Sequence, residues 1–215
     1  MAIDINSVYK EVLNIIKNED VEKGYESSQR SFVRRPYLTP EEFNQFAERA
    51  QLDIFENYLT EYKKAVIIGD EKNKDLFRHK LSGFKSAGVD VDKTTGAVSG
   101  DTNAYVERIY DSANGVKYEE VSRDYFEKVK AYSSSKAFLT ATNPKNHIYY
   151  KHLYNTMVFH PTPTANPDAE VIKYPNTPKW GYNVDNNTVT SDSTTTVNFL
   201  LNEDDRGTLV NKILE

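Results

Sequence analysis

Residues 38–64, "LTPEEFNQFAERAQLDIFENYLTEYKK", contain the clearest structural signal in this chain. Thr39 is a typical N-cap residue, because its hydroxyl accepts a hydrogen bond from a free backbone N–H group. Pro40 stands at the first helical position, where its missing donor costs nothing, and Glu42 completes a capping box. We therefore predict a helix that begins at Pro40.

The apolar residues of this stretch recur every three or four positions, which places them on one face of a helix. They are Phe43, Phe46, Ala47, Ala50, Ile54, Tyr58, Tyr62 and Ala65. A helix that continues to about Val66 is roughly 40 Å long. A helix of this length needs partners along its whole apolar face, and it contains no residue pattern typical of catalysis.

The overall composition bounds the class of protein. The chain has 215 residues, a net charge of -5, fifteen tyrosines and no cysteine. Its length fits one globular domain or two small ones. Mild acidity argues against sequence-independent binding to duplex nucleic acid, and the lack of cysteine excludes disulfides and thiolate metal sites. Residues 1–20 resemble neither a signal peptide nor a membrane span, so we expect a soluble protein made in the cytoplasm.

Two further helices are expected near the ends of the chain. Asp4 can cap the first, and Asn202 can cap the last. The first has an apolar stripe of Val8, Val12, Ile15 and Ile16. The last has an apolar face of Leu209, Val210, Ile213 and Leu214. Because so short a C-terminal helix is marginal alone, we expect it to dock on the N-terminal helix pair.

Short β-type runs fill the middle of the chain from Thr102 onward. They are "AYVERIYD", "GVKYEEVS", "HIYYKHLY", "TMVFHP", "AEVIKYP" and "TTTVNFLL". Asn114-Gly115 and Asn155-Thr156 are candidate hairpin turns, and Ser122 can cap a helix between the second and third runs. Strands at this spacing favour a small antiparallel sandwich over a parallel sheet.

We therefore predict an α+β fold. Long N-terminal amphipathic helices and a short C-terminal helix form one part, and an antiparallel β-sandwich-like domain is inserted between them. The helical part comprises residues 1–70 joined by 202–215, and the β-rich domain comprises residues 71–201.

The residues that carry chemistry in other proteins form no convincing site here. His147, His152 and His160 are separated by five and eight residues, so no pair has the i, i+4 spacing of a helical zinc site. "DVDKTTGAVSGD" resembles a calcium-binding loop, with ligand-like offsets at Asp90, Asp92, Thr94 and Asp101. Its glycine falls one position late, so we favour a turn-rich loop. No nucleophile or phosphate-binding motif occurs. We predict no catalytic, cofactor-binding or metal residues.

Two local features leave alternatives open. Arg30, Arg34 and Arg35 cluster in an aperiodic stretch, where they contact an acidic partner or DNA, or are simply solvated, which we favour. The only tryptophan lies in "YPNTPKWGYN". Trp180 either anchors an interface or stacks on a sugar, or it fills the end of the sandwich, which is the commoner use of the ring.

The order of motifs along the chain resembles a family of tailed-phage virion structural proteins. After a short first helix, the resemblance is carried by Gly24-Tyr25, "LTPEEFNQFAERAQLDIFENY", "EEVSRDYF", "YYKHLYNTMVFHPTP", "PKWGY" and "NFLLNEDDRGTLVNKIL". It spans nearly the whole chain. The family resembled is that of the head-to-tail adaptors, also called connector or ring proteins, of short-tailed and crAss-like phages.

The resemblance implies a non-enzymatic structural protein of the virion, which joins the portal to the tail around the DNA channel. It implies a homo-oligomer, a dodecameric ring, that encircles DNA without binding it specifically. Its partners would be the portal protein and tail or other ring proteins, with no membrane and no cofactor. Helix faces and aromatic anchors would make the contacts. The interface positions are Phe43, Phe46, Ile54, Tyr58, Tyr62, Arg30, Arg34, Arg35 and Trp180.

Two functions from other classes remain as alternatives. A tail-associated receptor-binding or carbohydrate-binding module would use the tyrosines and Trp180, and it would expose these rings in a groove. A glycan-degrading tail enzyme would need two carboxylates about 5–10 Å apart in a cleft. An adaptor, in contrast, would bury its aromatic rings at subunit contacts.

Overall fold

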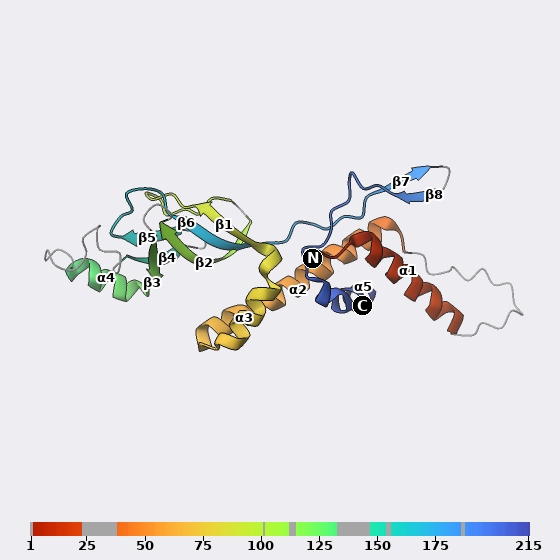
Figure 1. Ribbon diagram of the computed structural model, residues 1–215, viewed down its shortest axis with the longest axis horizontal. Coiled ribbons are helices and arrows are strands. Elements are labelled where there is room, and N and C mark those ends of the chain that lie inside the picture. The colour runs from red at the N-terminus through yellow and green to blue at the C-terminus, as the bar shows by residue number, and fades with distance from the viewer. Residues whose placement is uncertain are drawn as a thin grey trace, which may run out of the picture. The chain divides into compact units, whose positions relative to one another are not determined.

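The computed structural model describes residues 2–22, 38–100, 102–111, 115–132, 147–153, 156–185 and 188–215 (Figure 1). The predicted arginine cluster and the turn residues Asn114 and Asn155 lie outside these ranges. The chain divides into two compact units. The helical unit comprises Met1–Gly83 and Pro175–Glu215, and the β unit comprises Phe84–Tyr174.

In its described residues, the helical unit contains four α-helices, two short 3₁₀ turns and one hairpin. Its elements are α1 (Ile5–Glu22), α2 (Pro40–Ile68), α3 (Glu71–Lys80), η1 (Ser82–Phe84), β7 (Tyr182–Asp185), β8 (Thr188–Ser191), η2 (Glu203–Asp205) and α5 (Arg206–Leu214). The turn η1 ends one residue beyond the unit boundary.

The start of α2 is confirmed in atomic detail. The Thr39 hydroxyl accepts from the Glu42 backbone N–H at 3.2 Å, and the Glu42 carboxylate accepts from the Thr39 N–H at 2.9 Å. The helix ends at Gly69, whose φ of 77° lies in the left-handed region that glycine adopts without strain. Its 29 residues correspond to about 43 Å.

The buried face of α2 is wider than the predicted stripe. Phe55 and Leu59 are buried as well, and so is the polar side chain of Gln51. The Gln51 side-chain amide donates to the Asn176 carbonyl at 2.9 Å and accepts from the Leu200 N–H at 2.9 Å. A second row of α2 is therefore covered by the returning chain, residues 175–201, which single-helix periodicity does not reveal.

The C-terminal helix docks on α1 and α2, as predicted. Leu209, Val210 and Ile213 are buried. Arg206 makes an ion pair of 2.9 Å with Glu11 of α1. The predicted cap at Asn202 is wrong, because its side-chain amide instead donates to the His79 carbonyl at 3.2 Å. A 3₁₀ turn precedes α5 in place of a side-chain cap.

The predicted strand "TTTVNFLL" is also wrong. Within this run only Val197 makes a strand-like bridge, with Lys179. The hydroxyls of Thr194 and Thr196 bind Asp192 instead, through its carboxylate and its carbonyl respectively. Such local side-chain bonds compete with strand pairing, so the regular hairpin, β7–β8, forms just before this run.

The described part of the β unit is a six-stranded sheet with one α-helix. Its elements are β1 (Lys85–Asp90), β2 (Asn103–Asp111), β3 (Val116–Glu120), α4 (Arg123–Tyr132), β4 (Ile148–Leu153), β5 (Thr156–His160) and β6 (Asp168–Lys173). The strand order is β1-β6-β2-β3-β4-β5. Each pair is antiparallel except β3–β4, which is parallel.

The helix α4 explains the parallel pair. Parallel neighbours need a crossover that carries the chain back to the start of the next strand, and α4 lies between β3 and β4 in the chain. It starts at the predicted cap, since the Ser122 hydroxyl accepts from the Tyr125 N–H at 3.3 Å. Its buried Phe126 ring meets the Tyr150 ring edge-on at 4.7 Å. The helix thus covers one face of the sheet at β4.

A loop at residues 91–98 links the two edge strands of the sheet. It follows the edge strand β1 and bridges to the opposite edge strand β5, where the Met157 N–H donates to the Gly96 carbonyl at 2.9 Å. Val91 and Val98 join the core on the other face of the sheet. The edge of β5 that faces away from β4 is a place where strands of other molecules can add to a sheet. Here the chain's own loop lies against this edge.

The α+β class, with N-terminal helices, a C-terminal helix and β structure between, is confirmed. Two details differ from the sequence prediction. The inserted strands form one mixed sheet plus the separate β7–β8 hairpin, in place of an antiparallel sandwich. The chain passes from one compact unit to the other at residues 83/84 and 174/175. The helix α3 and residues 175–201 therefore belong to the helical unit and not to the insertion.

Candidate functional site

The predicted interface residues of α2 fall into two groups. Phe43, Ile54 and Tyr62 are almost completely buried, so they stabilise the core of their own unit and are not available to a partner on its surface. The Phe43 ring, for example, meets the Tyr9 ring of α1 edge-on at 4.9 Å. Phe46, in contrast, is 45% exposed. Of the apolar stripe, Phe46 is therefore the aromatic residue best placed for contact.

Tyr58 belongs to an internal clamp. Its hydroxyl donates to the Asp205 carboxylate at 2.8 Å, and Lys80 makes an ion pair with the same carboxylate oxygen. Burial, and then the bond to Asp205 and its charge, raise the pKa of Tyr58. Because Asp205 is buried, this carboxylate connects α2, α3 and η2 inside the helical unit. The Tyr58 hydroxyl is thus hydrogen-bonded inside the helical unit.

Trp180 is an internal anchor and not an exposed ring. It is 4% exposed and stacks on the Tyr9 ring at 3.8 Å between centroids. Its indole N–H donates to Asn6 at 3.2 Å, and its backbone N–H donates to Asn44 at 2.7 Å. Its ring therefore cannot stack on a sugar in this structure. It also fills the helical unit, so the expectation that it closes the end of the β domain is wrong.

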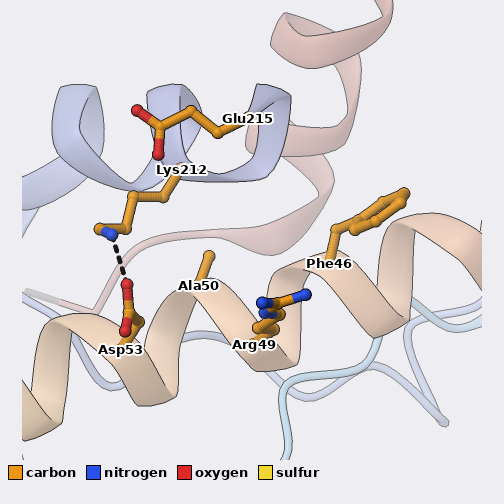
Figure 2. Close-up of a pocket in the computed structure, with 6 residues that line it drawn as sticks. All are labelled: Phe46, Arg49, Ala50, Asp53, Lys212 and Glu215. Carbon is orange, nitrogen blue, oxygen red and sulfur yellow. Dashed lines mark hydrogen bonds and ion pairs between the residues drawn. The ribbon is translucent and has the colours of Figure 1, made fainter.

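An open groove lies between α2 and α5. It has a volume of about 330 Å³ and is lined by Phe46, Arg49, Ala50, Asp53, Lys212 and Glu215. Figure 2 shows α5 above α2, with Lys212 extending down from α5 toward Asp53, and with Phe46 and Ala50 pointing up from α2. The groove has an apolar part, made by Phe46 and Ala50, and charged residues around it.

The charges of the groove are partly balanced inside it. Lys212 makes an ion pair with Asp53, and this bond raises the pKa of Lys212 (Figure 2). Arg49 and Glu215 have no ion-pair partner among the residues that the structure describes. The groove is therefore suited to an apolar group that carries neighbouring charges of both signs, which is the chemistry of a protein surface.

A second exposed apolar feature lies at the other end of α2. We call Val66, Ile67 and Ile68 the α2 tip. Ile67 is 84% exposed and Ile68 is 79% exposed. Isolated exposed apolar residues are common, but three consecutive ones at a helix end form a patch that a binding partner could cover.

Most of this site was not predicted from the sequence, although two signals were present. Arg49 and Asp53 are four residues apart and follow Phe46 at helical spacing, so they mark a line of α2 beside the apolar stripe. The consecutive residues Val66, Ile67 and Ile68 turn about 100° each around a helix, so they cannot share one buried face. Nothing in the local sequence indicates that Lys212 and Glu215 meet α2.

The histidine side chains that the structure describes do not gather into a metal site. In the described ranges, no three His, Asp or Glu side chains are placed to share a metal ion. Ile148 pairs with His160 across β4 and β5, so His147, the residue before Ile148, points to the opposite face of the sheet from His160. The side chain of His152 lies outside the described part of the chain.

The calcium-like loop is a turn. The Asp92 carboxylate accepts from the backbone N–H groups of Thr94 and Thr95, at 2.8 Å and 2.7 Å. These two bonds lower the pKa of Asp92. The carboxylate that would head a cation site therefore stabilises its own loop. Asp101, the last of the candidate ligands, lies outside the described residues.

His160 gives the β unit an expected pH dependence. Its burial, together with the positive charge of Lys130, lowers the pKa of His160 below the ordinary 6.5. The unfolded chain then binds more protons than the folded chain at mildly acidic pH, so stability is expected to fall as the pH drops through 6.5 toward the folded pKa. Thermal unfolding midpoints between pH 7.5 and 5 measure this loss.

A matched pair of variants isolates the effect. H160Q removes the titrating group, and its midpoint should fall less on acidification than that of the unaltered protein. H79Q replaces a histidine with an exposed side chain and should leave the acid-dependent loss as it is. Identical pH profiles for the unaltered protein and H160Q would show that His160 is not responsible.

No helix in the described ranges combines the length and apolar character that a membrane crossing requires. Comparison with known proteins identifies no family for the chain. No model of a protein family matches it, and no curated protein matches it either.

Proposed function

We propose that this protein is a non-enzymatic structural component of a tailed-phage virion, and that it acts as a head-to-tail connector, or adaptor ring. In this role it joins the portal protein to the tail or to other ring proteins around the DNA channel. It encircles DNA without recognising its sequence, needs no cofactor, and acts in the virion after synthesis in the host cytoplasm. The motif order given above motivates the proposal.

The observation that carries the proposal is the exposed groove on a firmly held long helix. α2 is capped at both ends, joined to α5 through Lys212 and Asp53, and joined to α3 through Tyr58, Asp205 and Lys80. A scaffold of this kind holds Phe46 and its neighbours in a fixed position. Mechanical coupling between virion parts needs a rigid body with adhesive surfaces, and it needs no reactive group.

The direct test is mass photometry of the protein mixed with assembled portal rings from the phage that encodes it. We expect a saturating mass increase with the stoichiometry of a ring. The protein alone is a poor test, since a connector can remain monomeric until a template assembles it. A well-folded protein that leaves the portal mass unchanged would contradict the proposal. The alternative, a tail-associated receptor-binding or carbohydrate-binding module, would then be tested on glycan arrays.

Phe46→Ala is expected to weaken this assembly without unfolding the protein. Phe46 is about half exposed, so its truncation removes little core packing, whereas an aromatic anchor at an interface contributes about 2 kcal/mol or more. We expect at least a tenfold higher protein concentration for half-saturation of the portal, and an almost unchanged thermal midpoint.

Tyr125→Ala is the matched control for this variant. Tyr125 is 54% exposed and lies on α4 of the β unit, outside the groove and outside the α2 tip. It should saturate the portal at the same concentration as the unaltered protein. Equal weakening by both variants would mean that general surface apolarity, and not the groove, determines assembly.

A further inference from the structure

We infer that the groove between α2 and α5 receives the α2 tip of a second copy of this chain. The occupant is thus Ile67 and Ile68 of a neighbouring molecule. The contact is head-to-tail along α2, because the groove lies near the start of this helix and the tip lies at its end.

The two surfaces match in size and chemistry. The groove volume of about 330 Å³ is roughly twice the 150 Å³ of an apolar cavity that holds one benzene molecule. Two branched side chains that protrude from a helix end are an occupant of suitable size. Ile67 and Ile68 are the two most exposed large apolar residues in the described part of the chain. Phe46, which is 45% exposed, supplies the apolar surface that would cover them, and Ala50, which is 3% exposed, lines the groove beside it.

The charges beside the two surfaces are complementary. Lys72 and Asp75 lie in the first two turns of α3, directly after the tip. Both are exposed, and neither has an ion-pair partner within the described ranges. The groove offers Glu215 and Arg49, which also lack such partners. Two surfaces of one chain therefore present one unpaired cation and one unpaired anion each. Opposite charges at the rim of a contact fix its orientation.

The tip cannot occupy the groove of its own molecule. Ala50 and Ile68 lie eighteen residues apart on one continuous helix, which corresponds to about 27 Å. The partner must therefore be another molecule. Because the tip and the groove are different surfaces, the contact is heterologous, and it repeats from copy to copy into a ring if it closes or into a filament if it does not.

The contact is expected to be weak between two free molecules. Two isoleucines bury little surface against the loss of translational and rotational freedom on association. Ring closure, or a template that holds several copies, raises the effective concentration and strengthens the assembly. In this respect the inference rests on the proposed function, since a ring on a template is the useful product of such a contact.

The natural absence of cysteine allows a specific cross-linking test. R49C places one thiol in the groove and I68C places one at the tip. The two single variants, one carrying a mass tag, are mixed and treated with a short bismaleimide, with and without portal rings. We expect mixed dimers of R49C with I68C, at least fivefold above the dimers of either variant alone. The double variant R49C/I68C should form a ladder of higher oligomers.

V184C serves as the matched control, because Val184 is 64% exposed and lies on β7, and it belongs neither to the groove lining nor to the α2 tip. If V184C cross-links to I68C as well as R49C does, the reaction is random collision and the inference is wrong. Dimers of I68C with itself as the main product would also overturn it, since they indicate a symmetric contact. A lysine–glutamate swap gives a second readout. K72E in the I68C chain should reduce the yield of mixed dimer, and the further change E215K in the R49C chain should restore it.

The two proposals fail in different ways. Portal rings that gain mass without any R49C–I68C cross-link would retain the connector function and overturn the self-docking contact. Mixed dimers and ladders without any portal binding would support the contact and contradict the connector function.

Discussion

Gly96→Ala is expected to destabilise the β unit by about 2–5 kcal/mol, a large part of the stability of a small domain. A Cβ atom at this position would lie 1.7 Å from the Met157 carbonyl oxygen and 2.6 Å from its carbon. Both are backbone atoms of the edge strand β5, so no side-chain rotation relieves the overlap. The residue also has a φ of 68°, which costs a non-glycine residue about 1–2 kcal/mol.

Gly88→Ala is the matched control. Gly88 has the same φ of 68°, but a Cβ atom there would meet nothing within 4 Å. This variant should lose only the backbone cost of about 1–2 kcal/mol. Urea unfolding followed by circular dichroism compares the two variants. Similar losses would mean that the loop moves away from β5 at little cost, and that its link between the sheet edges is not a main source of stability.

Trp180→Ala is expected to cost the helical unit about 3–5 kcal/mol, the usual range for truncation of a buried tryptophan. The change leaves a cavity beside Tyr9, removes the ring stack, and deprives Asn6 of its indole partner. Since the same ring would be the fluorescent probe, far-ultraviolet circular dichroism should follow the urea transition. We expect a lower midpoint with an unchanged slope.

Trp180→Phe separates ring packing from the polar contact. It keeps an aromatic ring against Tyr9 but lacks the N–H that binds Asn6, so its loss should be clearly smaller than that of the alanine variant. A loss below about 1 kcal/mol for Trp180→Ala would be incompatible with a buried anchor. Such a result would favour an exposed ring, and with it the receptor-binding alternative.

The helices were the predictable part of the fold because their signals are local. The capping box of Thr39 and Glu42 and the Ser122 cap lie within a few residues of the backbone groups they bind. The β structure was less predictable because strand pairing joins residues far apart in the chain. The helical run before β4 did hold one usable clue, since a helix between two adjacent strands implies a parallel pair.

The candidate site was predictable only in part, for a similar reason. Helical periodicity places Phe46 on the apolar face of α2. It does not distinguish the exposed edge of that face from its buried centre. That distinction depends on α5, whose Lys212 meets Asp53 across 159 positions of sequence. The position of Trp180 was also hidden in the sequence. Its hydrogen-bond partners Asn6 and Asn44 are polar residues, so they gave no apolar signal that would place them beside a buried ring.

The first and last strands of the β unit are direct neighbours in its sheet. Lys85, at the entrance of the unit, pairs with Ile172, just before its exit. Antiparallel partners have Cα atoms about 5 Å apart, so a gap of this size could be closed by a turn of two or three residues. We therefore call the β unit a cassette, meaning an insertion whose two ends lie close together. In evolution such a cassette can be lost, enlarged or exchanged for another fold while the helical host keeps its own core, and the host and the cassette are free to diversify at different rates.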